Sequence, residues 1–281
     1  MSLPDFLIIG AMKSGTTTLQ AQLAAQPGLF MTNPKEPNFF SDDPIYARGL
    51  DWYGALYADA ASGDLKGEAS THYTKLPTYP ATATRLAEAV EAPRLIYMIR
   101  NPVARAVSHY IHEWTQGLMS ADSDAAFAQH PELEAYSRYG MQIAPYIDRF
   151  GAEAVHLTSL EQIQTDPEGE LQKIGTHIGA PAPLVWDHGI GAQNVSAERV
   201  RRLPMHKLLV GNPVAAALRR TLIPKSIRTR IREGRKPSTR PELSDRLKRR
   251  LETDFLQDRA ALAGYFPDHP ALTACYPFAA S

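Results

Sequence analysis

The chain has 281 residues, of which 44% are hydrophobic, and its 30 basic and 30 acidic side chains leave a formal net charge of zero. This length and hydrophobic content exclude a disordered chain and allow one large α/β domain with insertions, residues 1–281. The lone cysteine, Cys275, excludes an internal disulfide, and no apolar run approaches the ~20 residues that span a bilayer.

The apolar run Phe6–Ile9 predicts a buried strand near the start of the sequence. No charged and apolar leader precedes it, so we expect a soluble, cytoplasmic protein. A loop with two glycines follows, and the spacing of Leu19 and Leu23 then predicts a helix. Glycines let backbone amides turn inward, and a helix N-terminus attracts negative charge. The sequence therefore predicts an anion site made by Lys13, Ser14, Gly15, Thr16, Thr17 and Thr18.

This loop departs from the Walker A pattern of nucleoside triphosphatases, G-x-x-x-x-G-K-[ST]. Gly10 and Gly15 have the required spacing, but Thr16 stands where the pattern needs a lysine. Lys13 lies inside the loop instead, beside a leaving-group oxygen of the bound anion, and no acidic ligand for Mg²⁺ is close in the sequence. The loop therefore favours a metal-free transfer of an anionic group, and we expect no metal site.

A second strand and helix are predicted at residues 94–110. Asn101 is a suitable helix N-cap and Pro102 suits the first helical position. Arg100 then lies at the carboxyl end of the strand, and Ser108 about two turns into the helix. In a parallel sheet the ligands collect at this edge, where the first loop also lies. Two anion sites on one edge indicate one ligand with two phosphates.

Later segments continue the alternation of strands and helices that a parallel sheet needs. Residues 152–157 predict a third strand. Asp166 is a suitable cap for a helix that ends at Gly179. A last helix is predicted to start at Pro241, with Leu243, Leu247, Leu251 and Phe255 at fourfold spacing.

Basic residues gather late in the chain. Residues 198–250 contain 17 of the 30 Lys and Arg residues and only four acidic ones. We interpret residues 198–240 as an insertion that forms a solvated face and a lid over a doubly anionic ligand. Amphipathic stretches at 217–225 and 227–232 also allow contact with an anionic glycan or a membrane lipid surface. Nucleic acid is not expected, because no recognised nucleic-acid module accompanies the charge.

Two of these motifs together resemble the sulfotransferase family that uses 3′-phosphoadenosine 5′-phosphosulfate (PAPS). Residues 4–17 look like its 5′-phosphosulfate loop, and Arg100-Asn101-Pro102, with Arg105 and Ser108, looks like its 3′-phosphate motif. The resemblance is closer to the heparan sulfate sulfotransferases and their bacterial relatives than to the cytosolic small-phenol enzymes. It implies a P-loop-like, three-layer sandwich around a mainly parallel sheet.

Further segments are similar to the heparan branch. Residues 35–40 resemble the stretch that carries the acidic base, and residues 67–70 resemble its Glu-Lys-Ser/Thr strand, with Ala69 in place of the lysine. The late loop over the 3′-phosphate is similar to Gly234-Arg235-Lys236, although Glu233 replaces a lysine there. The animal heparan enzymes are anchored in Golgi membranes, so the expected cytoplasmic location favours a bacterial-type enzyme.

The resemblance implies that a sulfuryl group passes in line from PAPS to a hydroxyl or amine of a glycan, lipid or small metabolite. By analogy with phosphoryl transfer, Lys13 would stabilise the leaving 5′-phosphate. The alternatives are a P-loop kinase or NTPase and a non-catalytic nucleotide-binding module. Thr16 and Arg100 disfavour the first, because they stand where a Walker lysine and a Walker B acid are expected, and Glu36 with Lys13 disfavours the second.

Two residues compete for the role of general base. Glu36 matches the position of the heparan-type base, and we expect the neighbouring Phe39 and Phe40 to raise its pKa by desolvation. His72 is similar to the catalytic histidine of the cytosolic enzymes and starts with a pKa nearer neutrality. We favour Glu36. His109 and His112 are expected on a helix surface or lining an acceptor cleft.

Overall fold

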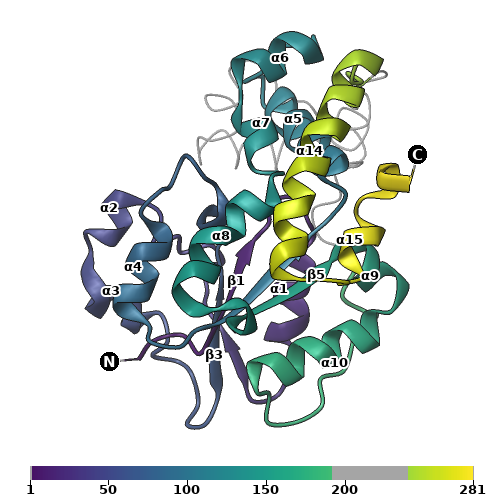
Figure 1. The fold of residues 1–281 in the computed structure, drawn as a ribbon. Coiled ribbons are helices and arrows are strands. Elements are labelled where there is room, and N and C mark those ends of the chain that lie inside the picture. Colours follow the sequence, from purple (N-terminus) through teal and green to yellow (C-terminus); the bar gives the residue numbers. More distant parts are fainter. Residues whose placement is uncertain (1, 192–239, 281) are drawn as a thin grey trace, which may run out of the picture.

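The computed structural model describes residues 2–191 and 240–280, and in these ranges five parallel strands form one sheet (Figure 1). The strand order is β2-β3-β1-β4-β5, so β1 lies in the middle. The strands are β1 Phe6–Gly10, β2 Leu29–Met31, β3 Leu65–Ala69, β4 Arg94–Ile99 and β5 Val155–Ser159. The prediction of an α/β fold with a parallel central sheet is confirmed.

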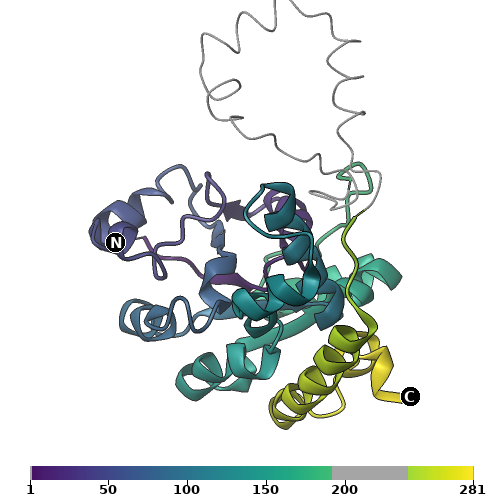
Figure 2. The same cartoon turned by 90° about the horizontal axis from the view of Figure 1, so that it is seen from above.

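Helices cover both faces of this sheet, as Figures 1 and 2 show from two directions. The longer ones are α1 Thr16–Ala24, α4 Thr82–Ala89, α5 Pro102–Thr115, α8 Tyr139–Phe150, α10 Pro167–Ile178 and α14 Asp245–Tyr265. The shorter ones are α2 Asp43–Tyr46, α3 Gly49–Ala55, η1 Thr71–Thr74, α6 Ser123–Gln129, α7 Glu132–Ala135, η2 Ala152–Ala154, α9 Leu160–Thr165, α15 Ala271–Ala274 and η4 Pro277–Ala280.

Alternate residues of the central strands pack into two separate hydrophobic layers, because successive strand side chains point to opposite faces. On β1, Leu7 and Ile9 belong to a core cluster shared with α4, α5, α8 and α14. Phe6 and Ile8 belong to the other cluster, which contains residues of α1, α9 and α10. The sheet is therefore the middle of three layers, and its carboxyl edge stays available for loops.

Helix caps stand where the sequence predicts them in two of the helices. Asn101 accepts a hydrogen bond at its Oδ1 from the Ala104 amide at 2.9 Å, and Pro102 is the first residue of α5. Asp166 accepts at its Oδ1 from the Gly169 amide at 2.9 Å, and α10 ends at Gly179 with φ 72°. These caps satisfy amides that have no partner within the helix, so they set where α5 and α10 begin.

Two predicted boundaries are wrong. Residues 152–154 form the 3₁₀ turn η2, so the third predicted strand starts only at Val155. The last helix starts at Asp245 and not at Pro241. Its N-cap is Ser244, whose Oγ accepts from the Leu247 amide at 3.1 Å, and this cap sets the start of the helix. The predicted core positions of this helix, Leu247, Leu251 and Phe255, are buried.

Several sequence predictions fall in residues 192–239 and lie outside the described residues. They comprise most of the proposed lid, the amphipathic stretches at 217–225 and 227–232, and the late loop with Gly234 and Arg235. In the part of the chain that the structure describes, no helix is long and apolar enough to cross a membrane.

Candidate active site

The loop between β1 and α1 has the backbone geometry of an anion cradle. Gly15 is the residue before α1 and has φ 96°, a conformation that suits glycine. A Cβ at Gly15 would lie 2.9 Å from Cε of Met98 and 3.0 Å from Cδ1 of Leu160, so there is no room for a side chain. The amides of a first helical turn have no partner within their helix, and the positive end of the helix dipole lies there. Lys13, Ser14, Thr16, Thr17 and Thr18 all belong to this junction.

Two buried polar atoms beside the loop have no hydrogen-bond partner among the described residues. They are the Oγ of Ser14, a residue with 0% exposure, and the Nε of Arg100. Buried polar atoms are nearly always paired in native proteins, so such atoms mark a place where a polar ligand fits. The side chains at this junction therefore fit a bound phosphate group.

The second predicted motif meets the first one at this edge of the sheet. Nη1 of Arg100 donates to the carbonyl oxygen of Lys13 at 3.2 Å, and the hydroxyl of Tyr139 donates to the carbonyl oxygen of Arg100 at 2.8 Å. Arg100 and Ser108 line one cavity of about 750 Å³, whose other wall contains Lys248 and Glu252 of α14. The structure thus brings the two sequence-predicted residues to a single cavity large enough for a nucleotide-sized ligand.

Arg105, the third residue of the second motif, does not line this cavity. Its side chain is fully buried, its Nε donates to Oγ of Ser137, and its Nη2 donates to the carbonyl oxygen of Leu133 at 2.6 Å. Burial lowers its pKa to about 10. Arg105 therefore ties α5 to the segment around α7 and supports the motif from inside the protein.

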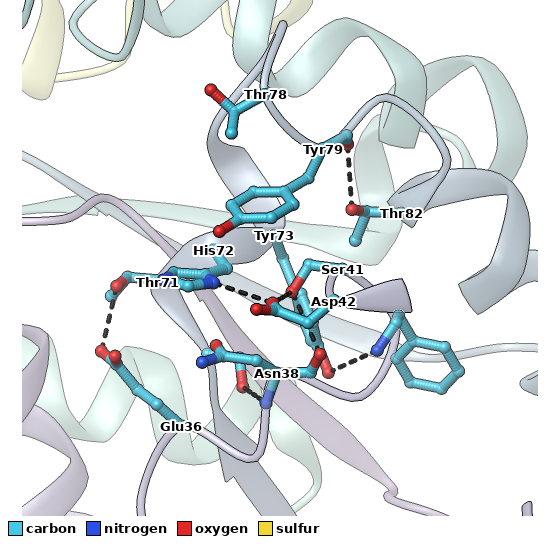
Figure 3. Close-up of polar contacts among 12 residues, drawn as sticks. Glu36, Asn38, Ser41, Asp42, Thr71, His72, Tyr73, Thr78, Tyr79 and Thr82 are labelled. Atoms are coloured by element: carbon cyan, nitrogen blue, oxygen red, sulfur yellow. Dashed lines mark hydrogen bonds and ion pairs between the residues drawn. The ribbon is translucent and has the colours of Figure 1, made fainter. Parts of the chain in front are cut away.

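Glu36 lies in the loop after β2, at the same edge of the sheet. Its amide donates to the carbonyl oxygen of Ala69 at 3.0 Å, which fastens the loop to the end of β3. Its Oε1 accepts from Nζ of Lys35 and from Oγ1 of Thr71, both at 3.0 Å (Figure 3 shows the second contact). These two hydrogen bonds therefore hold the carboxylate through the same oxygen, Oε1.

The expected rise of the Glu36 pKa is wrong in direction. Burial is the largest influence and raises it, but the charge and hydrogen bond of Lys35, the hydrogen bond of Thr71 and the charge of Lys75 together lower the pKa. Phe39 and Phe40 are buried in the core, where both rings contact the ring of Tyr53.

His72, the competing base, lies beside Glu36. Its Nδ1 is 2.9 Å from Oδ2 of Asp42, and its ring stacks on that of Tyr79 with 4.7 Å between centroids (Figure 3). Burial lowers its pKa, although Asp42 opposes this change. Thr71, the residue before His72, donates to Glu36, so the structure brings the two candidates together and leaves both as predictions.

His109 does not lie on a helix surface, which was one of the two places expected for it, and the other, an acceptor cleft, stays a prediction. It is 5% exposed, and its ring stacks on that of Tyr136 with 5.7 Å between centroids. Burial, with the positive charges of Arg105, Lys75 and Lys13, lowers its pKa to about 2. The imidazole is therefore neutral throughout the ordinary pH range. His112, one turn further, is half-buried.

Sequence reasoning missed two charged residues at this edge, Asp42 and Lys75. Asp42 orients His72, and Lys75 follows the turn η1 after β3. Neither belongs to a recognisable motif. The only signal was that Asp42 follows residues 35–40 and Lys75 follows residues 67–70, the two segments that resemble the heparan branch.

A loop that leads from the middle strand of a parallel sheet into a helix N-terminus through Gly15 places the protein in the P-loop-like class of α/β folds. Within this class the chain belongs to the sulfotransferase family, since the model of the sulfotransferase domain matches residues 3–256. The solved structure of a sulfotransferase from Alicyclobacillus acidocaldarius has a TM-score of 0.67 at 24% identity over 97% of this chain and 99% of that one. That likeness concerns the fold.

Named relatives agree with this family. Heparan sulfate glucosamine 3-O-sulfotransferase 6 of Homo sapiens is 31% identical over 196 residues, 66% of this chain and 55% of that protein. Membrane-associated sulfotransferase kil1 of Dictyostelium discoideum is 36% identical over 113 residues, 39% of this chain and 23% of that protein. The chain thus spans about half or less of the length of these relatives. The kinase alternative finds no support in these matches.

Proposed function

We propose that the protein is a PAPS-dependent sulfotransferase that sulfates a hydroxyl or amine without a metal ion. The observation that carries the proposal is the contact of Arg100 with the loop carbonyl of Lys13, beside a cavity that Arg100 and Ser108 line together. One ligand with two separate phosphate groups suits this pairing. When bound, PAPS would supply the activated sulfuryl group.

The residues of the two motifs hold different phosphate groups of this cofactor. The amides at the start of α1, Ser14 and the hydroxyls of Thr16, Thr17 and Thr18 hold the 5′-phosphate. Lys13 stabilises the negative charge that develops on its bridging oxygen, which is an electrostatic form of catalysis. Arg100 and Ser108 hold the 3′-phosphate, and we propose that the late loop with Gly234 and Arg235 covers it.

Glu36 is the proposed general base. Its Oε1 already accepts two hydrogen bonds, and the described residues contribute no donor to its Oε2. Oε2 is therefore the atom that takes the acceptor's proton. The lowered pKa keeps the carboxylate ionised at neutral pH, the state that a base needs. His72, held by Asp42, remains the competing candidate.

A glycan is a suitable acceptor class, since several named relatives are heparan sulfate enzymes. The basic residues 198–250 would attract an anionic glycan or an anionic lipid surface. A lipid or a small metabolite is the remaining option for the same transfer. We propose a cytoplasmic location for the enzyme.

Calorimetry without Mg²⁺ tests the proposal directly. Adenosine 3′,5′-bisphosphate, the product that PAPS would leave, should bind, and ATP should bind far more weakly. ATP binding of comparable strength that requires Mg²⁺ would instead support an NTPase. Screening acceptors with radiolabelled PAPS then separates an enzyme from a non-catalytic binding module, because only an enzyme transfers the label.

A further inference from the structure

Lys75 is a nearly buried cation at the carboxyl edge of the sheet. It follows η1 and is 9% exposed. Lysine is seldom buried unless its ammonium is paired. Among the described residues, however, the ion pairs shorter than 4 Å do not include Lys75, and its Nζ lies 5.8 Å from the ring centroid of Tyr136. The position thus holds a positive charge that no carboxylate of residues 2–191 or 240–280 contacts.

Charged and titratable groups from several elements surround Lys75. The titratable and charged groups that act on it or feel its charge are Glu36 and Asp42 before β3, His72 in η1, Arg105, His109 and Glu113 on α5, and Tyr136 after α7. Burial lowers the pKa of Lys75 to about 8, and the carboxylates oppose this only in part. Lys75 is therefore charged at neutral pH and loses its proton under mildly alkaline conditions.

Lys75 and the loop lysine Lys13 act on the same buried histidine. Both Lys13 and Lys75 lower the pKa of His109, and Lys75 also lowers that of Glu36. Lys75 thus lies within electrostatic reach of the histidine that Lys13 also reaches and of the proposed base. Thr71, at the other end of the turn η1 from Lys75, donates a hydrogen bond to Glu36 at 3.0 Å, so Lys75 directly follows the turn that holds the proposed base.

We propose that the Lys75 ammonium binds the sulfuryl oxygens of PAPS and follows that group during transfer. The inference rests on the proposed function. In the step, the bond from sulfur to the bridging oxygen of the 5′-phosphate breaks, and a bond from sulfur to the acceptor oxygen or nitrogen forms. The acceptor's proton passes to Glu36, the electron pair of the broken bond stays on the phosphate, and Lys75 keeps its proton and only donates hydrogen bonds.

Calorimetry with PAPS and with adenosine 3′,5′-bisphosphate tests this without any acceptor. Because only PAPS carries the sulfuryl group, Lys75→Met should weaken PAPS binding about tenfold or more and change bisphosphate binding less than about twofold. Lys75→Arg should restore most of the PAPS affinity. Lys66→Met, at the amino end of β3, is the matched control and should change neither affinity.

The pH dependence adds a readout that loss of packing would not produce. Between about pH 7 and pH 9.5 the wild-type protein should lose affinity for PAPS but not for the bisphosphate, because Lys75 deprotonates in this range. Lys75→Arg should abolish that loss, since guanidinium stays charged. This pH titration of the wild-type protein also tests the inference if the Lys75→Met variant does not fold.

The outcomes separate the inference from the proposed function. If the wild-type protein binds PAPS and the Lys75 variants bind it equally well, the inference is overturned and the proposed function stands. An equal weakening for both nucleotides also overturns it, because the sulfuryl group is then not what Lys75 contacts. If the wild-type protein binds neither nucleotide, both proposals are overturned.

Discussion

Nη1 of Arg100 donates a hydrogen bond to the carbonyl oxygen of Lys13 at 3.2 Å, across 87 residues of sequence. The contact fastens the loop after β1 to the end of β4. Arg100 also lines the cavity that contains Ser108. The same guanidinium is therefore placed to hold the loop in shape and to face a ligand.

Replacing Arg100 should weaken the binding of adenosine 3′,5′-bisphosphate. We expect Arg100→Ala to cost about 1.5–3 kcal/mol, the value of a hydrogen bond to a charged group. The variant should also lose its preference for PAPS over adenosine 5′-phosphosulfate, which lacks the 3′-phosphate. Arg94→Ala, at the exposed amino end of the same strand, is the matched control for calorimetry. An unchanged preference would place the 3′-phosphate elsewhere.

Glu36→Gln keeps the shape of the side chain and removes the proton acceptor. We expect kcat to fall by roughly 10² to 10⁴, with cofactor affinity nearly intact. His72→Ala should have a much smaller effect. The measurement needs single turnovers with an acceptor found by screening, so that product release does not hide the chemical step. If His72→Ala loses most of its activity while Glu36→Gln reacts at nearly the wild-type rate, His72 and not Glu36 is the general base.

Two helical glycines should respond oppositely to alanine. A Cβ at Gly140 in α8 would lie 2.7 Å from the carbonyl oxygen of Asp258 and 2.9 Å from the amide nitrogen of Leu262, both in α14. Gly140→Ala should therefore push the two helices apart and destabilise the protein by about 1–3 kcal/mol.

Gly264 in α14 is the matched control, because a Cβ there meets nothing within 4 Å. Gly264→Ala should stabilise the protein by about 0.5–1 kcal/mol, since alanine loses less backbone entropy in a helix. Urea unfolding at neutral pH measures both changes. Shifts of the same sign would mean that the contact between α8 and α14 is looser than described.

His109 should make the protein sensitive to mild acid. The folded state keeps it neutral down to about pH 2, whereas the unfolded chain binds a proton below about pH 6.5, so stability falls as the pH falls through this window. His109→Gln should remove about 2 kcal/mol of the loss between pH 6.5 and pH 5. Urea unfolding at both pH values tests this. The control His188→Gln, at an exposed side chain, should keep the wild-type loss.

The centre of the fold could be predicted because its signals are local. The apolar runs of β1 and β4 and the dipeptide Asn101-Pro102 each fit in a few residues, and the structure has them at the predicted places. The strand β2 was not predicted because it has only three residues, Leu29–Met31, which are too few to show a periodic hydrophobic pattern. The start of α14 was missed because the sequence was read from Pro241 and not from the cap at Ser244.

The electrostatics of the site could not be predicted, because they depend on contacts between distant segments. The pKa of Glu36 is lowered most by its neighbour Lys35, but also by the hydrogen bond of Thr71, which is 35 residues away, and by the charge of Lys75. The buried ring of His109 stacks on that of Tyr136, which follows α7 and is 27 residues away in the sequence. No periodicity or motif in a single sequence reports such pairs.

The strand order places the two predicted phosphate-binding segments on one side of the sheet edge and the two candidate bases on the other. β1, with the phosphate loop, has β4 on one side and β3 on the other. The segment with Arg100 and Ser108 follows β4, while the loop with Glu36 follows β2 and the turn with His72 follows β3. Under the proposed function, replacing loops on the β2–β3 side would change the molecule that receives the transferred group and leave the grip on the two phosphates of the donor intact. A fold arranged in this way would acquire new acceptors by mutation without rebuilding its phosphate-binding segments.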